Sequence, residues 1–230
     1  MEQLRKEVLE ANLEVVRRGL VLYTFGNVSG ISRHDGLVVI KPSGVPYASM
    51  KPSDLVIVDL DGKPVEGTLR PSSDVATHVI LYKAFPEIGG VVHTHSRAAT
   101  AWAQARQPIP CFGTTHADYF YGPIPVTDAL TSAEIEGDYE ANTGHAIVRT
   151  IGKQHPLQMR AVLVSQHAPF TWAKTPAEAA QLAVILEEVA ALALQTVSID
   201  TSAQPIARSL LDRHFFRKHG TEAYYGQPVK

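Results

Sequence analysis

Short runs of β-branched and aliphatic residues alternate with helical segments along the whole chain, and this alternation is the strongest constraint on its fold. Residues 28–32 and 37–40 flank a His-Asp-Gly turn, a pattern typical of a β-hairpin. Residues 55–60, 91–95 and 161–164 predict further strands. A hairpin followed by interleaved helices and strands predicts an α/β fold, with a mixed sheet covered by helices on both faces.

Six segments carry helical signals, either apolar residues at helical spacing or an N-terminal cap such as Thr131 or Thr175, which precedes Pro176. Helices are therefore expected at residues 2–18, 75–85, 97–104, 131–151, 176–196 and 205–218. The chain has no repeat of 20 to 50 residues and no linker rich in Gly, Ser or Pro. We therefore expect one domain over residues 1–230.

The charge balance restricts the classes of partner. The chain of 230 residues has 21 Lys and Arg against 23 Asp and Glu, a net charge of -2. This argues against electrostatic capture of nucleic acid or an anionic membrane, so a bound anion needs a local site. Cys111 is the single cysteine, which excludes an intramolecular disulfide. Glu187 and Glu188 interrupt the most apolar helix, and the N-terminus lacks a signal pattern, so a soluble cytoplasmic protein is expected.

Three histidines and one aspartate are candidate metal ligands. His93 and His95 end an apolar run, and alternate residues of a strand share a face. The pair alone could equally be polar residues on the wet face of an edge strand. His167 follows another predicted strand, and Asp74 begins a predicted helix, where it could simply be a cap. Three imidazoles and a carboxylate suit Zn2+, and also Co2+ or Mn2+.

Three pairs of small polar residues are candidates for binding an anion. They combine close backbone approach with hydrogen-bond donors, and they are Gly26-Asn27, Ser43-Gly44 and Ser72-Ser73. Each pair alone is more often an ordinary turn. Lys41, next to the second pair, could add a positive charge, although we expect it to be solvated.

Six motifs, in this order along nearly the whole chain, resemble the class II aldolase/epimerase superfamily and, within it, the pentulose-phosphate 4-epimerase branch. They are Gly26-Asn27-Val28-Ser29, Lys41-Pro42-Ser43-Gly44, Ser72-Ser73-Asp74, His93-Thr94-His95-Ser96, His116-Ala117-Asp118-Tyr119, and Arg217-Lys218-His219-Gly220 with Tyr224-Tyr225-Gly226. The resemblance implies a three-layer α/β/α domain with a largely antiparallel sheet. One departure is Ser165, where some relatives are expected to carry another histidine.

The resemblance also implies a role for each candidate residue. Zn2+ would be held by Asp74, His93, His95 and His167, and the three small polar pairs would hold the substrate phosphate. Asp118 and Tyr225 would transfer protons, with Tyr225 reaching into the active site of a neighbouring subunit of a C4 homotetramer. The C-terminal tail would thus contribute to a subunit interface. His214 and Arg217 would line the same inter-subunit site.

The activity that the resemblance implies is the interconversion of L-ribulose 5-phosphate and D-xylulose 5-phosphate. A C4 hydrogen is not acidic, so the reaction would cleave the C3–C4 bond by a retro-aldol step, rotate the aldehyde and re-form the bond. Two alternatives are an aldolase that releases its products and a non-catalytic oligomerisation module like an adducin head. In the aldolases a glutamate is expected where Asp74 stands, so this residue favours the epimerase.

Overall fold

One continuous sheet of seven strands runs through the computed structural model, which describes residues 1–220 and 223–224. The order across the sheet is β4-β3-β2-β1-β5-β7-β6. The strands are β1 (Asn27–Ser32), β2 (Leu37–Ile40), β3 (Val56–Asp59), β4 (Pro64–Glu66), β5 (Gly90–His93), β6 (Ala161–Leu163) and β7 (Pro169–Ala173). All pairings between these strands are antiparallel, and parallel pairing is limited to an isolated bridge between Val126 and Leu163 within the described residues. The expected largely antiparallel sheet is confirmed.

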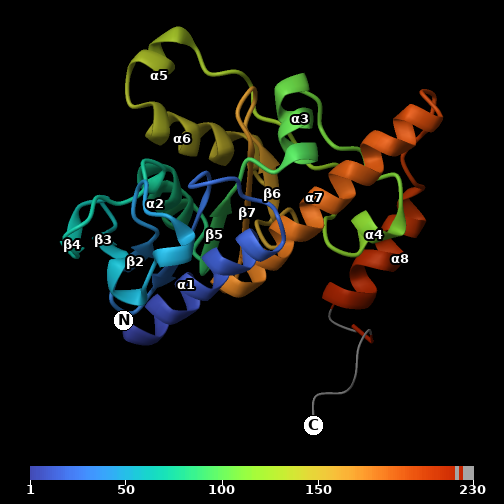
Figure 1. Ribbon diagram of the computed structural model, residues 1–230. Helices are drawn as coiled ribbons and strands as arrows, with labels where there is room; N and C mark the ends of the chain where they lie inside the picture. Colours follow the sequence, from blue (N-terminus) through green and yellow to red (C-terminus); the bar gives the residue numbers. More distant parts are fainter. Residues whose placement is uncertain (221–222, 225–230) are drawn as a thin grey trace.

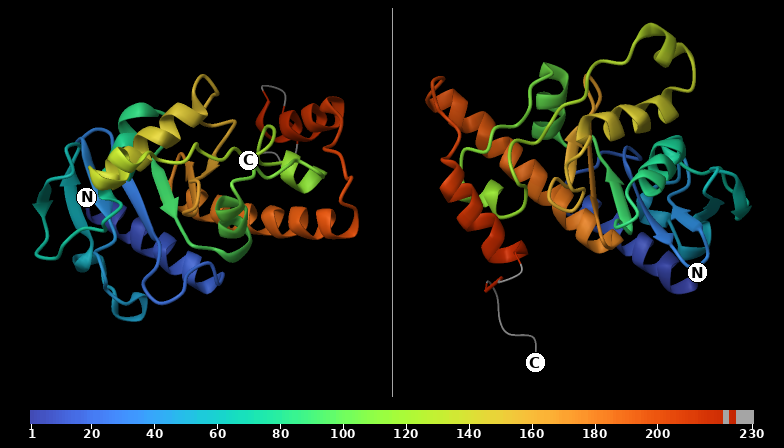
Figure 2. Two further views of the ribbon diagram at one scale, coloured as in Figure 1. Left: turned by 90° about the horizontal axis from the view of Figure 1, so that it is seen from above. Right: turned by 180° about the vertical axis from the view of Figure 1, so that it is seen from behind.

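Helices cover both faces of this sheet. They are α1 (Glu2–Arg17), α2 (Val75–Ala84), α3 (Arg97–Ala105), α4 (Thr114–Ala117), α5 (Ser132–Glu136), α6 (Tyr139–Ile151), α7 (Pro176–Ile199) and α8 (Arg208–His219), with 3-10 turns η1 (Tyr47–Ser49) and η2 (Pro52–Asp54). Helices α1 and α7 pack against one face, and α2 and α6 lie over the other (Figure 2). The α4 and α8 helices lie together at one end of the molecule, beyond the sheet (Figure 1). This is the expected α/β architecture with helices on both faces.

The N-terminal helix follows directly from its sequence pattern. Val8, Ala11 and Val15 of α1 recur at helical spacing and are buried, while the charged residues between them face solvent. Asn12, also buried, exchanges hydrogen bonds with the backbone of Val28 in β1 through its side-chain amide. The apolar stripe and this amide together fix α1 against the start of the strand that leads into the site.

The helix expected at 131–151 is wrong as a single element, because the structure has two helices, α5 and α6. The break falls at Gly137, and Asp138 starts the second helix by accepting a hydrogen bond from the backbone of Ala141. Gly144, which weakens helical propensity, instead lies within α6. A Cβ there would meet Ile80 of α2 at 3.0 Å, so the glycine allows the two helices to pack closely.

Other differences are local. Strand β7 was not expected; it is buried throughout, so it lacks the alternating pattern of a half-exposed strand. The strand expected at 91–95 ends at His93, which leaves His95 just beyond the sheet. The last helix begins at Arg208 instead of residue 205.

Helix α7 passes a length and composition test for a membrane span, with a mean hydropathy of 1.8 over its most apolar window. In the structure it packs against α1, α3 and the sheet. Glu187 of α7 accepts hydrogen bonds from the backbone amides of Ala98 and Ala99 at the start of α3. Part of its apolar surface is thus buried against the rest of the fold, while Leu192, Leu194 and Ile199 near its C-terminal end are exposed.

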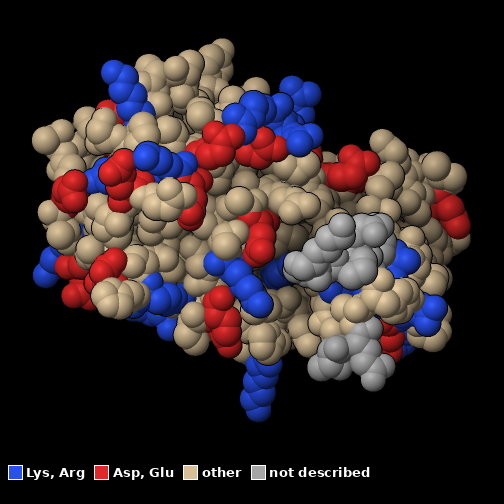
Figure 3. Space-filling model, turned by 90° about the horizontal axis from the view of Figure 1, so that it is seen from below, with Lys and Arg blue, Asp and Glu red and all other residues tan. Residues whose placement is uncertain are grey.

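The charged surface has no large area of one sign on the face drawn in Figure 3. Lysine and arginine side chains lie interspersed with aspartate and glutamate across that face (Figure 3). This distribution agrees with the net charge of -2 and with the expectation that anions are recognised by a local site.

Candidate metal centre

The sheet register brings the metal-ligand candidates together. His93 is the last residue of β5, where it pairs with Asn27 of β1 on one side and Phe170 of β7 on the other. His167 lies in the tight turn between β6 and β7, directly before the strand that pairs with β5. A residue in this turn, Gln166, adopts a left-handed conformation with φ of 60°. The two neighbouring strands therefore place His93 and His167 side by side.

His93, His95 and His167 form one cluster of imidazoles. Their ligand atoms all lie within 4.8 Å of one another. Nε2 of His93 is 3.1 Å from Nε2 of His95, and the His93 ring centroid is 4.8 Å from that of His167. Nδ1 of His93 lies 3.0 Å from the carbonyl of Pro169 and is assigned as the donor, which leaves Nε2 with a lone pair. Converging nitrogens of this kind suit a divalent metal ion.

The protonation state of these histidines also suits a metal. Burial, and then the charges of His93 and His95, lower the pKa of His167 to about 4. Burial and the charge of His93 likewise lower the pKa of His95. Neutral imidazoles at neutral pH have the lone pairs that coordination requires. The donor set therefore fits Zn2+ or a similar divalent ion.

Asp74, the fourth predicted ligand, lines the same cavity but is not a member of the cluster within 4.8 Å. It occupies the N-cap position of α2, yet its side chain forms no capping hydrogen bond. Its carboxylate instead accepts a hydrogen bond of 2.6 Å from the side chain of Asn27. Burial acts to raise its pKa, but His93, His78 and Asn27 outweigh burial and the pKa is lowered. Asp74 is thus an ionised carboxylate beside the histidines.

The three small polar pairs converge on this cavity, which has a volume of about 380 Å³. Its wall includes Gly26, Asn27, Ser43, Gly44, Ser72 and Ser73, together with the histidines, Asp74 and Lys41. Gly26 has a φ of +84°, and a Cβ there would meet the carbonyl of His93 at 2.7 Å. Glycine is therefore required where this loop passes the end of β5. Asn27 links two of the three pairs through a hydrogen bond of 3.0 Å to Ser72.

Lys41 is buried, so the expectation of a solvated lysine was wrong. Only 2% of its surface is exposed. Nζ donates a hydrogen bond to the carbonyl of Pro42 and lies 4.7 Å from the centroid of the Tyr47 ring. Burial lowers the pKa of Lys41 to about 8. The residue therefore brings a positive charge to an otherwise neutral group of hydrogen-bond donors.

Several cavity residues were not anticipated from the sequence. Tyr139 and Glu140 begin α6, and the hydroxyl of Tyr139 lies 3.3 Å from Nδ1 of His167. Phe25 also lines the cavity, with its ring 6.0 Å from that of His95. The sequence offered one signal for Tyr139. Asp138 is a residue type that favours a helix N-cap, and a helix that starts there places Tyr139 in its first turn instead of in the middle of a longer helix.

Asp118 belongs to a second cluster, at the junction of α4 and α8. Arg217 forms hydrogen bonds of 2.9 and 3.0 Å to its carboxylate, and His214 and Lys218 lie 3.0 and 3.3 Å from it. Burial acts to raise the pKa of Asp118, but these partners outweigh it and lower the pKa. Asp118, His214 and Arg217 do not line the metal cavity of the same chain, as far as the described residues show. Tyr225 lies outside the described residues.

The chain is similar over nearly its whole length to proteins of one family. Residues 6–194 match the class II aldolase and adducin N-terminal domain. The chain is 54% identical over 227 residues to the L-ribulose-5-phosphate 4-epimerase UlaF of Salmonella paratyphi B, covering 99% of this chain and all of that protein (100%). The same identity and coverage hold for the Salmonella typhi protein of that name.

Solved structures show the same fold. An L-fuculose 1-phosphate aldolase superposes with a TM-score of 0.78 at 24% identity, covering 92% of this chain and 94% of the other. An aldolase II superfamily protein from Pseudomonas syringae gives a TM-score of 0.77 at 16% identity, covering 99% and 87%. The family match and the full-length relatives together establish that the chain belongs to the class II aldolase and adducin N-terminal domain family.

Proposed function

We propose that this protein is a metal-dependent epimerase that interconverts L-ribulose 5-phosphate and D-xylulose 5-phosphate. The observation that carries the proposal is the full-length identity of 54% to proteins of that name, in a chain with three clustered imidazoles beside an anion-binding wall. A whole-chain match supports a single catalytic domain over residues 1–230. The relatives are named as sugar-phosphate epimerases, which supports a soluble metabolic enzyme. We propose that the protein is cytoplasmic.

The metal would be held by His93, His95 and His167, with Asp74 as the proposed fourth ligand. When bound, a divalent ion would supply Lewis-acid stabilisation of the enediolate that forms when the C3–C4 bond breaks. Zn2+ is the proposed ion because its usual ligands are imidazole and carboxylate, and Co2+ or Mn2+ are alternatives.

The phosphate end of the substrate would lie against the three small polar pairs. Backbone amides and the hydroxyls of Ser43, Ser72 and Ser73 are neutral donors, and Lys41 adds one buried charge. The phosphate on C5 stays with the aldehyde after cleavage. This wall must therefore retain the fragment while the aldehyde group rotates and presents its other face to the enediolate. A set of neutral donors suits that task better than a rigid bidentate arginine contact.

Asp118 and Tyr225 are the proposed proton-transferring pair. One group would remove the C4 hydroxyl proton before cleavage, and the other would return a proton after the aldehyde has rotated. Its charged partners lower the pKa of Asp118, so the carboxylate is ionised at neutral pH and can accept a proton. Because Asp118 does not line the metal cavity of its own chain in the described residues, we propose that a neighbouring subunit brings it there.

A homotetramer with C4 symmetry would supply this arrangement. Each subunit would contribute a metal cavity to one site and its α4–α8 end, with Asp118, His214 and Arg217, to the next. The C-terminal tail, including Tyr225, would extend the same interface. Closed cyclic symmetry makes all four shared sites equivalent.

A direct assay tests the proposal. The purified protein is incubated with L-ribulose 5-phosphate, and D-xylulose 5-phosphate and free aldehyde are followed together. An epimerase gives the epimer without accumulating aldehyde, whereas an aldolase gives stoichiometric aldehyde without the epimer. Removal of metal with a chelator should abolish the reaction, and restoring the metal should recover it. Unchanged turnover in demonstrably metal-free protein would contradict the mechanism.

A further inference from the structure

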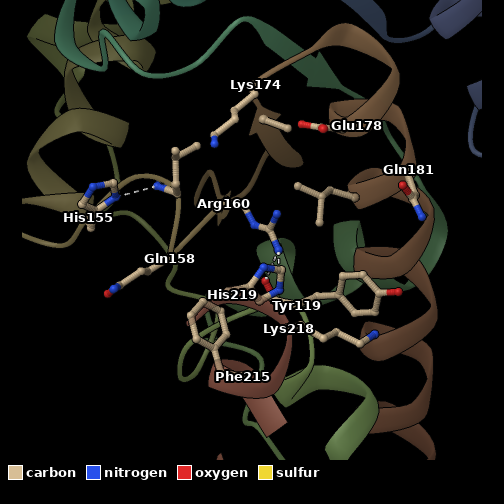
Figure 4. A pocket seen from close by; sticks show the side chains of 13 residues that line it. Tyr119, His155, Gln158, Arg160, Lys174, Glu178, Gln181, Phe215, Lys218 and His219 are labelled. Atoms are coloured by element: carbon tan, nitrogen blue, oxygen red, sulfur yellow. Dashed lines mark hydrogen bonds between the residues drawn. The ribbon is translucent and has the colours of Figure 1, made fainter. Parts of the chain in front are cut away.

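A second cavity lies apart from the metal centre and has a volume of about 630 Å³. It is bounded by the end of β7, the first turns of α7, the loop before β6 and the C-terminal turns of α8 (Figure 4). Its lining has no residue in common with the wall of the metal cavity in the described parts of the chain. The volume is within the range of sites that hold small molecules.

Positive groups dominate this cavity. The charged residues of its lining are Arg160, Lys174 and Lys218, whereas Glu178 is its one carboxylate among the described residues. His155 and His219 also line it, and burial lowers the pKa of His219, which favours the neutral imidazole. Figure 4 shows the guanidinium of Arg160 near the centre, with Lys174 on one side and His219 and Lys218 on the other. On a chain with a net charge of -2, this is a local excess of positive charge.

Arg160 has hydrogen-bond donors that the protein does not use. Its Nη2 donates to the carbonyl of Tyr119 at 2.9 Å and lies 3.3 Å from Nε2 of His219. Its Nε is buried without a partner, and its Nη1 makes no hydrogen bond within the described residues. Burial also lowers the pKa of this guanidinium, which an adjacent anion would counteract. Nε has almost no accessible surface, so a ligand in the cavity would have to use Nη1 of this guanidinium.

The lysines on either side differ in their surroundings. Lys174 is exposed and forms no ion pair within 4.0 Å among the described residues. Lys218 lies 3.3 Å from the carboxylate of Asp118 and 4.3 Å from the centroid of the Tyr119 ring. Lys174 is therefore available to a ligand directly, whereas a ligand would share Lys218 with Asp118.

We propose that this cavity binds a small anion carrying a phosphate or several carboxylates, with Arg160 and Lys174 as its principal contacts. A planar guanidinium beside a flexible ammonium suits either group, through charge-assisted hydrogen bonds. The site differs in kind from the catalytic cavity, whose anion wall consists mainly of neutral donors around one buried lysine.

The cavity is connected to Asp118 by two contacts, and to the neighbouring Tyr119 by a third. His219 donates to the backbone carbonyl of Asp118 at 2.8 Å, Arg160 to that of Tyr119, and Lys218 pairs with the Asp118 carboxylate. An anion that draws Lys218 towards itself would remove one of the charges that lower the pKa of Asp118. Occupancy would then change the pH dependence of turnover. This consequence rests on the proposed role of Asp118, whereas binding itself does not.

Calorimetric titration of the full-length protein tests the site, with inorganic phosphate and succinate, a dicarboxylate that chelates metal ions only weakly, as separate probes at fixed ionic strength. All titrations start from the variant Ser72→Asp. The new carboxylate lies in the catalytic cavity and repels anions there, so binding to the second cavity is measured alone. This variant should still bind one anion per subunit. Adding Lys174→Gln or Arg160→Gln should weaken that binding by at least about tenfold, the size expected for a hydrogen bond to a charged group. The tighter probe identifies the preferred anionic group.

A matched control removes the same charge elsewhere. Lys63 is exposed and does not line the cavity, so adding Lys63→Gln should leave the affinity unchanged. Lys174 is at the surface, so its variant keeps the test valid if the Arg160 variant does not fold. Absence of binding of both probes to Ser72→Asp, or an equal loss in Lys63→Gln, overturns the proposal. Because no turnover is measured, failure here is separate from failure of the epimerase assay.

Discussion

The metal cavity and the Asp118 cluster are held in place by different forces. In the cavity, strand register sets His93 opposite Asn27, and burial lowers the pKa of His95 and of His167, which favours their neutral forms. In the cluster, Asp118 is fixed by charged and polar partners from a single helix, α8. The first arrangement depends on the sheet, and the second depends on ion pairs at the end of the fold.

This difference has a consequence for how the two regions can work. A metal site needs several ligands fixed at short distances, and adjacent strands of one sheet provide that within one chain. The Asp118 cluster is anchored to α8 beyond the sheet, where it can be offered to another subunit (Figure 1). Variants that affect one region and spare the other therefore test the proposed division of labour.

The largest effect is expected from His95→Asn. It removes one imidazole from the cluster, and metal affinity should fall by more than about 100-fold, since even outer partners of metal ligands contribute 10- to 100-fold. Epimerisation should fall to background. Metal content after dialysis, measured by mass spectrometry, checks this. Full metal occupancy in the variant would exclude His95 as a ligand.

Asp118→Asn should separate the two regions. The substitution removes a proton-transferring group without touching the histidines, so turnover should fall by about 10²- to 10⁴-fold while metal content remains near that of the unaltered protein. Steady-state kinetics and metal analysis on the same preparation are the two measurements. Loss of metal would contradict the proposal that the metal cavity and the Asp118 cluster are held in place independently.

Mixed oligomers test whether the two regions meet between chains. Subunits with Tyr225→Phe and subunits with His95→Asn should each be inactive alone. If each site in a C4 ring takes its metal from one subunit and its tyrosine from the next, random mixing at equal amounts should restore roughly one quarter of full activity. No recovery in verified mixed oligomers would indicate that Tyr225 acts within its own chain.

The smallest effect is expected in the stability of the metal-free protein. Burial lowers the pKa of His167 and of His116 to about 4, from an ordinary value of 6.5. Between these two values the unfolded chain binds more protons, so the free energy of unfolding should decline as pH falls from about 6.5 towards 4. Urea titrations at several pH values measure the slope. His167→Gln, in the metal cavity, and His116→Gln, in α4, should each reduce this dependence of the unfolding free energy on pH.

Local sequence patterns predicted most of the fold. The apolar stripe of residues 2–18, the hairpin at 28–40 and the Thr175 cap before Pro176 all depend on neighbours in sequence, and the structure confirms them. Strand β7 and the break at Gly137 were not foreseen. A fully buried strand has no alternation, so its pattern is missed, whereas the break had a local signal in Gly137 followed by the capping residue Asp138.

For the site, the sequence alone identified residue types but not their neighbours. Three histidines and three small polar pairs were candidates from their chemistry, and sheet order then brought them to one cavity. The sequence alone also did not predict which polar side chains are buried. Lys41 was expected in solvent and is enclosed, because the 3-10 turn that carries Tyr47 places an aromatic ring against it.

The sequence by itself thus determined most helices and strands and the set of metal-binding and anion-binding candidates, because propensity, periodicity and side-chain chemistry are local properties. The tertiary structure decided which candidates share a cavity and which carry altered pKa values. It also separated Asp118 from the metal cavity of its own chain and assembled a second, basic cavity around Arg160. These outcomes depend on strand order and on burial, which arise only when distant segments pack together.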